Sequence, residues 1–451
     1  PPRSTPLYSS AASDVYKRQI LVLLSVCISE ATKLPSAKAN KTRDFLVIYT
    51  GNLLAELKPC GCAKEEDQGG IERRMQYLRD IRKDNPNILL VDTGDHFKEP
   101  TRQGKLKAET LMKATEKMNY DAVALGERDL LYGSQFLKRH SIPFISGNIE
   151  LENLTLEKSR IKNFQNGLKV AVLSVVDPSL FYLKNHVGLT IPDPDQIVSQ
   201  EISRIKNSHS IDFLILLTHM EKEKSLKYLE KDGVDLVING HIFSETDNVD
   251  MKPINKVDKI FVQASPRGQK MGELHISIDE AGKVSFKHRM VRLDSSINND
   301  PEMLKLYQIY NKKVEDIFFE SLKTKRNKNK VSVYAGDTVC KNCHKTAHEK
   351  WSSSKHGKAY ETLRKINKAF DPECLPCHVV GYNMQGGFIS ELDTPELKNV
   401  QCEVCHGAGK KHASAPMSGF GNEAKKTCKK CHVKNHSPKF NYNKYWPKII
   451  H

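Results

Sequence analysis

Four short cysteine–histidine motifs are concentrated in the last quarter of the chain. Two cysteines three positions apart can bond to the two vinyl groups of a haem, and the following histidine then binds the iron. Paired Cys-x-x-Cys is also zinc spacing, but zinc does not require a histidine after every pair, and only 17 of the 451 residues are histidine. The motifs therefore predict four covalent c-type haems, held by Cys340, Cys343, His344, Cys374, Cys377, His378, Cys402, Cys405, His406, Cys428, Cys431 and His432.

The same region has five further histidines that are candidates for the sixth iron ligand: His348, His356, His412, His436 and His451. Two histidine ligands on one iron give low potentials and rapid electron transfer, whereas an open position can bind a small molecule. The region has few core-forming residues for its length. We therefore expect a mainly α-helical fold built around haem.

The elements before these motifs alternate between strands and helices. Runs rich in β-branched residues predict strands at 45–49, 88–92, 170–176, 213–217, 234–238, 260–263 and 273–278. Helical periodicity occurs at 71–83, 106–118, 196–206 and 225–231. This order predicts a layered α/β domain with buried sheets, whose functional residues lie in loops after the strands.

Several of those loops have a recognisable form. They are residues 50–54 (TGNLL), 92–95 (DTGD), 125–129 (LGERD), 217–219 (LTH) and 239–243 (NGHIF). In this order they resemble the motifs of metallophosphoesterases of the periplasmic 5′-nucleotidase type. The resemblance implies a sandwich of two sheets with helices outside. It also implies two metal ions, bridged by the aspartate of the Gly-Asp motif, and hydrolysis of phosphate esters.

This sequence departs from the family pattern at the first metal. The family ligands Asp-x-His are Asn52 and Leu54 here, and the second histidine of Gly-His-x-His is Phe243. Leucine and phenylalanine cannot bind a cation. Arg128 replaces the catalytic histidine, and arginine can hold an anion but cannot act as a general acid near neutral pH.

The second metal keeps most of its ligands. The resemblance implies a site for one Zn, Mn or Fe ion, because Glu127 replaces the usual asparagine with another oxygen ligand. The alternative is that these polar residues only satisfy one another in a decayed site. The four candidate ligands are Asp95, Glu127, His219 and His241.

Cys60 and Cys62 follow the altered first loop, so we expect them near the former metal pocket. A disulfide across one glycine closes a tight, strained ring that is easily reduced. The pair is either an inert disulfide in an oxidising compartment, a redox-active pair, or a set of ligands for a soft metal beside His96.

The haem region resembles the tetrahaem cytochrome family whose best-known member accepts electrons from hydroxylamine oxidoreductase. The resemblance runs from residue 336 to about 451, through 340–344, 373–382 and 400–407, with Trp351 and Gly386-Gly387. It implies three haems with two histidine ligands each and one five-coordinate haem at the second motif. By this resemblance the distal ligands are His356, His412 and His451.

The domain organisation follows from these segments. Residues 1–19 resemble translated adaptor DNA, and residues 20–31 resemble part of a secretory signal, too short to span a membrane. We expect a soluble, periplasmic or otherwise exported protein, because bacteria attach c-type haem outside the cytoplasm. The expected domains are 44–293 (metallophosphoesterase-like), 294–330 (connecting helix and exposed basic linker) and 331–451 (tetrahaem cytochrome c).

Charge and motifs leave three hypotheses for function. The net charge of +16 is not concentrated in a nucleic-acid-binding motif, and suits an acidic or multihaem redox partner. We expect an electron-transfer cytochrome whose first domain keeps at most one metal. The alternatives are a phosphoesterase with a cytochrome appendage, and a small-molecule reductase at a five-coordinate haem.

Overall fold

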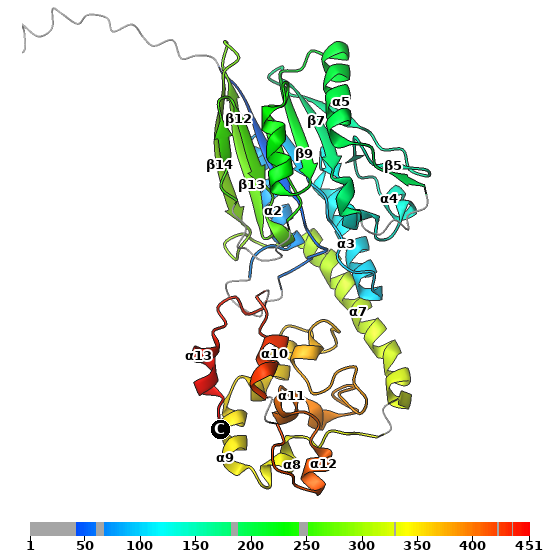
Figure 1. Cartoon of the computed structure of the whole chain (residues 1–451), viewed down its shortest axis with the longest axis vertical. Coiled ribbons are helices and arrows are strands. Elements are labelled where there is room, and N and C mark those ends of the chain that lie inside the picture. The colour runs from blue at the N-terminus through cyan, green and yellow to red at the C-terminus, as the bar shows by residue number, and fades with distance from the viewer. Residues whose placement is uncertain are drawn as a thin grey trace, which may run out of the picture.

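The computed structural model describes residues 42–59, 67–181, 188–242, 251–328, 331–421, 424–434 and 436–451. Figure 1 shows two bodies, one built of sheets and helices and one of short helices, with helix α7 (Pro301–Lys328) running from the first to the second. In the described part of the chain, no helix combines the length and apolar character needed to cross a membrane.

Two six-stranded sheets form the first body. The first sheet has the strand order β14-β13-β1-β2-β3-β4. Its strands are β1 (Arg43–Thr50), β2 (Ile88–Asp92), β3 (Ala122–Ala124), β4 (Phe144–Ile145), β13 (Lys270–Ile278) and β14 (Val284–Arg292). The second sheet has the order β11-β12-β10-β9-β7-β6. Its strands are β6 (Ser159–Asn163), β7 (Lys169–Val176), β9 (Phe213–His219), β10 (Leu236–Asn239), β11 (Ile254–Lys256) and β12 (Lys259–Gln263). The short strands β5 (Glu150–Leu151) and β8 (Leu189–Thr190) pair separately.

Alternate residues along each strand belong to different cores, since successive side chains point to opposite faces. Phe45, Val47 and Tyr49 of β1 pack between the two sheets, whereas Leu46 and Ile48 face the helices outside. The outer face of the first sheet is covered by α2 (Ile71–Asp84), α3 (Arg102–Met118) and α7. The outer face of the second is covered by α5 (Pro194–Ser208) and α6 (Lys222–Leu226). The expected layered sandwich is therefore confirmed.

The second body is mainly helical, as predicted for a cytochrome domain. Its helices are short, and only a few of its apolar side chains are buried, so its hydrophobic core is small. They are α8 (Asp337–Lys341), α9 (Lys345–Ser353), α10 (Ala359–Lys365), α11 (Cys402–His406), α12 (Lys410–Ser414) and α13 (Tyr442–Tyr445), with 3₁₀ turns that include η7 (Leu375–Cys377) and η9 (Ala424–Lys430).

The expected basic linker is helical instead. Helix α7 continues to Lys328, so the described part of the segment 323–330 is a helix and not a linker, although most of its side chains are exposed, as expected. Lys325 lies over the Tyr382 ring at 4.0 Å, and Arg326 pairs with Asp393 at 2.7 Å. These contacts with the second body hold the basic residues in the helix, which sequence composition alone does not reveal.

Candidate functional site

The four predicted metal ligands come from loops at one edge of the two sheets. Asp95 follows β2, and Glu127 opens the 3₁₀ turn η2 (Glu127–Leu130) after β3. His219 ends β9, and His241 follows β10. These strands are parallel to their neighbours, so their carboxyl ends meet at the same edge.

The ligand atoms of these four residues lie within 4.8 Å of one another. His219 Nε2 is 2.8 Å from Glu127 Oε2 and 3.5 Å from Asp95 Oδ1. His241 Nδ1 is 3.3 Å from His219 Nε2 and 3.6 Å from Glu127 Oε1. Ligand atoms about 2.0–2.2 Å from a tetrahedral ion lie about 3.3–3.6 Å apart. The two carboxylates and two imidazoles therefore fit one divalent metal ion.

Hydrogen bonds outside the cluster orient the ligands. His219 Nδ1 donates to Thr93 O at 2.9 Å, which leaves Nε2 for a metal. Gly126 must be glycine, because a Cβ there would lie 2.4 Å from Asp95 Oδ1 and 2.6 Å from the His219 ring. The backbone of the ligand loops is thus packed against the ligands themselves.

Without a metal ion, electrostatics within the cluster favour the metal-binding charge state of Glu127 and His241, whereas burial raises the pKa of Asp95 and the carboxylates favour a protonated His219. Burial raises the pKa of Glu127, but the hydrogen bond and charge of His219 outweigh it and lower the pKa to about 2. Burial and the neighbouring His219 lower the pKa of His241 to about 4, so this imidazole is neutral at pH 7. Burial opposes protonation of His219, but Asp95 and Glu127 raise its pKa well above the usual value. A metal ion would take the place of that proton between the carboxylates.

Asp129 and His96 hold the loops that carry the metal ligands, and the sequence analysis did not predict this role for either residue. The Asp129 carboxylate accepts hydrogen bonds from the backbone N–H groups of Asp95, His96 and Gly126, at 2.8, 2.8 and 2.7 Å. His96 Nδ1 lies 2.9 Å from Asp129 Oδ1, and Nε2 lies 3.2 Å from Asp92 Oδ1. Burial opposes the charge of His96, but the two carboxylates raise its pKa to about 10.

In the second body, three histidines of the Cys-x-x-Cys-His motifs face a second imidazole. Ring centroids are 6.4 Å apart for His344 and His412, 6.0 Å for His432 and His356, and 5.8 Å for His406 and His451. A transition metal binds imidazole nitrogen at about 2.0–2.1 Å, so rings on opposite sides of one metal have centroids about 6 Å apart. The three pairs fit iron ligands, and use the three predicted distal histidines.

The histidine of the second motif has a different setting. His378 Nδ1 donates to Ala359 O at 2.7 Å, which leaves Nε2 for iron. His348, in contrast, bonds to Asp337 Oδ2 at 2.8 Å through Nε2, and its ring lies tilted against that of Trp351, with centroids 5.2 Å apart.

The four Cys-x-x-Cys-His motifs lie next to one another in space in an order that differs from their order in the sequence. The Cys340 side chain lies beside that of Cys402, and the Cys377 side chain beside that of Cys431. Helix α11 of the third motif also packs against η9 of the fourth. These contacts place the four motifs in the order first, third, fourth, second.

Comparisons with known proteins cover both bodies. The model of the calcineurin-like phosphoesterase family matches residues 60–244, and that of the cytochrome c554 and c-prime family matches residues 339–407. The chain joins a calcineurin-like phosphoesterase domain to a cytochrome c554 domain.

Relatives support each domain separately. Human 5′-nucleotidase is 26% identical over 265 residues, which cover 52% of this chain and 46% of that protein. Cytochrome c-554 of Nitrosomonas europaea is 34% identical over 92 residues, or 17% of this chain and 39% of the relative. The 5′-nucleotidase precursor of Thermus thermophilus shares the fold, with a TM-score of 0.54 at 17% identity, covering 60% of this chain and 59% of that structure. The chain thus spans less than half the length of the two curated relatives.

The phosphoesterase domain has apolar or neutral groups where a second metal would need ligands. Leu54 is buried, and its backbone N–H bonds to Asp95 O at 3.1 Å. The Asn52 amide donates to Ile242 O at 3.3 Å. Arg128 Nε lies 3.5 Å from Asp95 Oδ2, at the exposed side of the cluster. These residues do not supply a second metal site or a general acid.

The possible soft-metal site of Cys60, Cys62 and His96 can be compared with the structure only at His96. Cys60, Cys62 and Phe243, like residues 1–31, lie outside the described residues. The sequence makes His96 a possible ligand beside the two thiols, but both of its ring nitrogens face buried carboxylates. The structure therefore assigns His96 to the support of the phosphoesterase domain's loops.

Proposed function

We propose that this chain is an exported tetrahaem electron-transfer protein whose phosphoesterase domain holds one divalent metal ion. The observation that carries the proposal is the set of three facing imidazole pairs, each built from a motif histidine and a distant one. Bound haems would supply four one-electron sites with potentials set by these ligands.

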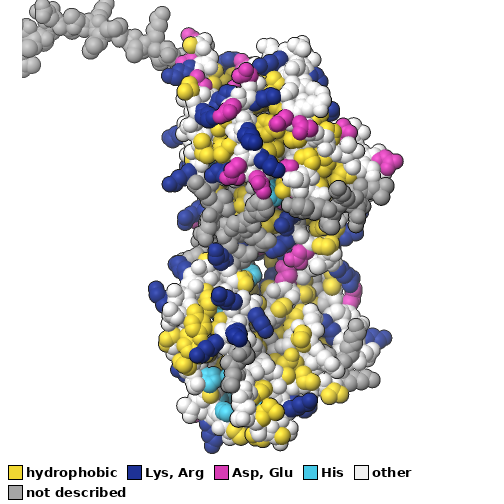
Figure 2. Space-filling model, in the orientation of Figure 1, with side chains coloured by type: hydrophobic (Ala, Val, Ile, Leu, Met, Phe, Trp, Pro, Cys, Tyr) yellow, Lys and Arg dark blue, Asp and Glu magenta, His cyan; other side chains and the backbone are white. Residues whose placement is uncertain are grey.

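Residues of the cytochrome domain would bind the haem irons and orient the iron ligands. Six imidazoles in three pairs favour low-spin iron, and the Ala359 carbonyl orients His378 at the remaining motif. Figure 2 shows more Lys and Arg than Asp and Glu side chains on the drawn face of the cytochrome domain. That surface suits an acidic or multihaem protein partner, since complementary charge accelerates association.

Phosphate ester hydrolysis is disfavoured as the main function. Two-metal hydrolysis requires both ions to stabilise the attacking and leaving oxygens. Asn52, Leu54 and Arg128 remove ligands and the acid from the phosphoesterase domain. An electron-transfer role does not require them.

Loss of one distal ligand tests the haem proposal. We expect the purified protein to contain about four haems and to bind about one carbon monoxide per chain, at the second motif. His356→Ala should raise carbon monoxide binding to about two per chain, because His432 would lose the ring opposite it. The measurement is a difference spectrum with haem quantified separately.

His348→Ala is the matched control, because His348 bonds to Asp337 and should leave carbon monoxide binding unchanged. Fewer than four haems, or equal binding by the wild type and His356→Ala, would contradict the assignment.

A further inference from the structure

A lysine of the phosphoesterase domain lies next to the second haem motif. Lys107 of α3 places Nζ 2.6 Å from Glu373 Oε2, and Glu373 directly precedes Cys374. The Lys107 side chain is 19% exposed and that of Glu373 is 47% exposed. The ammonium group of Lys107, in the phosphoesterase domain, therefore contacts the residue that precedes Cys374 of the cytochrome domain.

Further contacts fix this junction. Gln103, one turn before Lys107, donates to Asp371 Oδ1 at 2.9 Å and to the Tyr310 hydroxyl at 3.1 Å. Lys368 bonds to Asp371 Oδ2 at 2.8 Å. Tyr310 and Leu375 belong to one hydrophobic cluster, against which Cys374 packs. The junction is buried and partly apolar, so a charge there acts over a longer distance than in water.

The charge on Lys107 persists at neutral pH. Burial opposes it, but Glu373, Glu56 and Asp371 raise the pKa of Lys107 above its usual value. Glu56 belongs to the loop whose Leu54 and Ala55 N–H groups bond to Asp95 O and His96 O. Lys107 thus lies between the candidate metal loop and the second motif.

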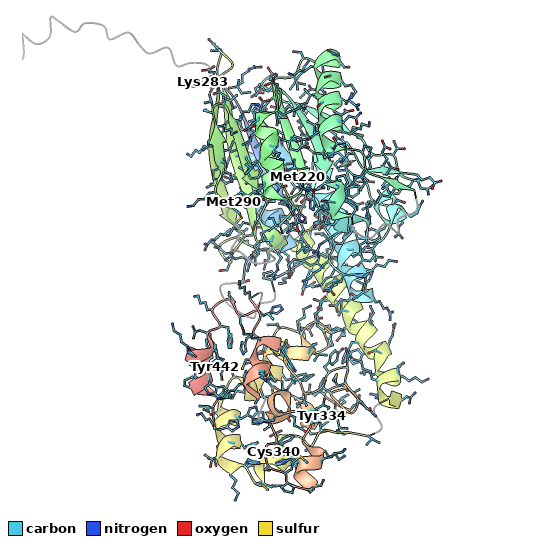
Figure 3. The ribbon with its side chains drawn as sticks, viewed as in Figure 1. Met220, Lys283, Met290, Tyr334, Cys340 and Tyr442 are labelled. Atoms are coloured by element: carbon cyan, nitrogen blue, oxygen red, sulfur yellow. The ribbon has the colours of Figure 1, made fainter. Side chains whose placement is uncertain are left out.

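The second motif is also one end of the row of attachment sites. The contacts of Cys340 with Cys402, of α11 with η9, and of Cys377 with Cys431 give the order first, third, fourth, second. Figure 3 shows Cys340, of the first motif, in the part of the cytochrome domain farthest from the phosphoesterase domain. The two ends of the row therefore have different surroundings.

We propose that Lys107 raises the reduction potential of the haem attached at Cys374 and Cys377, so that the phosphoesterase domain sets the potential at one end of the row. This inference rests on the proposed function, in which the second motif carries haem. Reduction of ferric to ferrous iron adds one electron, supplied by the protein redox partner. A fixed cation favours the reduced form, and the Glu373 carboxylate favours the oxidised form.

Opposite charge changes at the two partners test this role. In redox titrations of the full-length holoprotein at low ionic strength, Lys107→Met should lower the midpoint potential of one haem. Glu373→Gln should raise the potential of the same haem. The double variant should return near the wild-type value, because both charges are absent. The affected haem is identified by its high-spin, five-coordinate spectrum.

Matched variants separate charge from structure. Lys107→Arg keeps the charge and should keep the potential. Lys105→Met and Lys113→Met remove exposed lysines of the same helix and should leave all potentials unchanged. Unchanged potentials in both Lys107→Met and Glu373→Gln, with about four haems present, would overturn the inference. A missing second haem would instead contradict the proposed function.

Discussion

Replacing His96 with leucine is expected to reduce the free energy of unfolding by about 3–5 kcal/mol, the cost of breaking a buried ion pair by removing one partner. Both imidazole nitrogens face carboxylates, of Asp92 and Asp129, and all three side chains are almost completely buried. Without the imidazolium, two carboxylates would remain buried with no cation between them. Asp129 also holds three backbone N–H groups of the ligand loops, so the metal cluster should be disturbed as well.

The measurement is urea unfolding in the presence of a chelator, so that metal binding does not contribute. His96→Gln should cost less than leucine, because an amide can still donate to one carboxylate. His209→Leu is the control: it removes an exposed histidine after α5 and should change stability by less than about 0.5 kcal/mol. Equal stability of His96→Leu and wild type would contradict a charged imidazolium that stabilises the two aspartates.

Replacing Glu127 with alanine is expected to abolish stoichiometric binding of the non-haem metal. Glu127 contributes a carboxylate that contacts both His219 and His241, and the other carboxylate of the cluster, Asp95, is already a ligand. Even outer partners of metal ligands typically contribute about 10–100-fold to affinity, so a direct ligand should contribute more. Wild-type protein should retain about one such metal per chain after dialysis.

Elemental analysis, corrected for haem iron, gives the metal content, and titration of the metal-free protein with Zn, Mn and Fe distinguishes the ions. Glu280→Ala, at an exposed turn between β13 and β14, serves as the control. A wild type without metal would refute the site, and retention of metal by Glu127→Ala would refute its ligand set. If loaded wild type hydrolyses phosphate esters well above background, one metal suffices and the hydrolase alternative gains support.

The sequence predicted the core of the fold because the buried strands and the amphipathic helices carry strong periodic patterns. The predicted strand at 170–176 and helix at 71–83 match β7 and α2 to within one residue. Edge strand β14 was not predicted, although its half-buried residues alternate with exposed ones, which is the pattern of a strand with one exposed face. Helix α7 extends beyond its apolar pattern, since contacts with Tyr382 and Asp393 hold its basic end.

The residues of the candidate sites could be predicted wherever they belong to a short sequence motif. The Cys-x-x-Cys-His spacing and the loop motifs located the attachment residues and the four clustered ligands. Which imidazole faces which depends on contacts between distant segments, such as His432 with His356, and no local pattern encodes these. The same holds for Lys107 and Glu373, which are 266 positions apart.

One hydrophobic cluster continues from the outer face of the first sheet, through Tyr310 and Phe318 of α7, to Leu375 and Val379 of the second haem motif. Such shared packing makes the two domains cooperate in unfolding. A substitution that loosens the packing of Leu375 should therefore destabilise the phosphoesterase domain as well. It would expose apolar surface of both domains and make the chain a substrate for proteolysis.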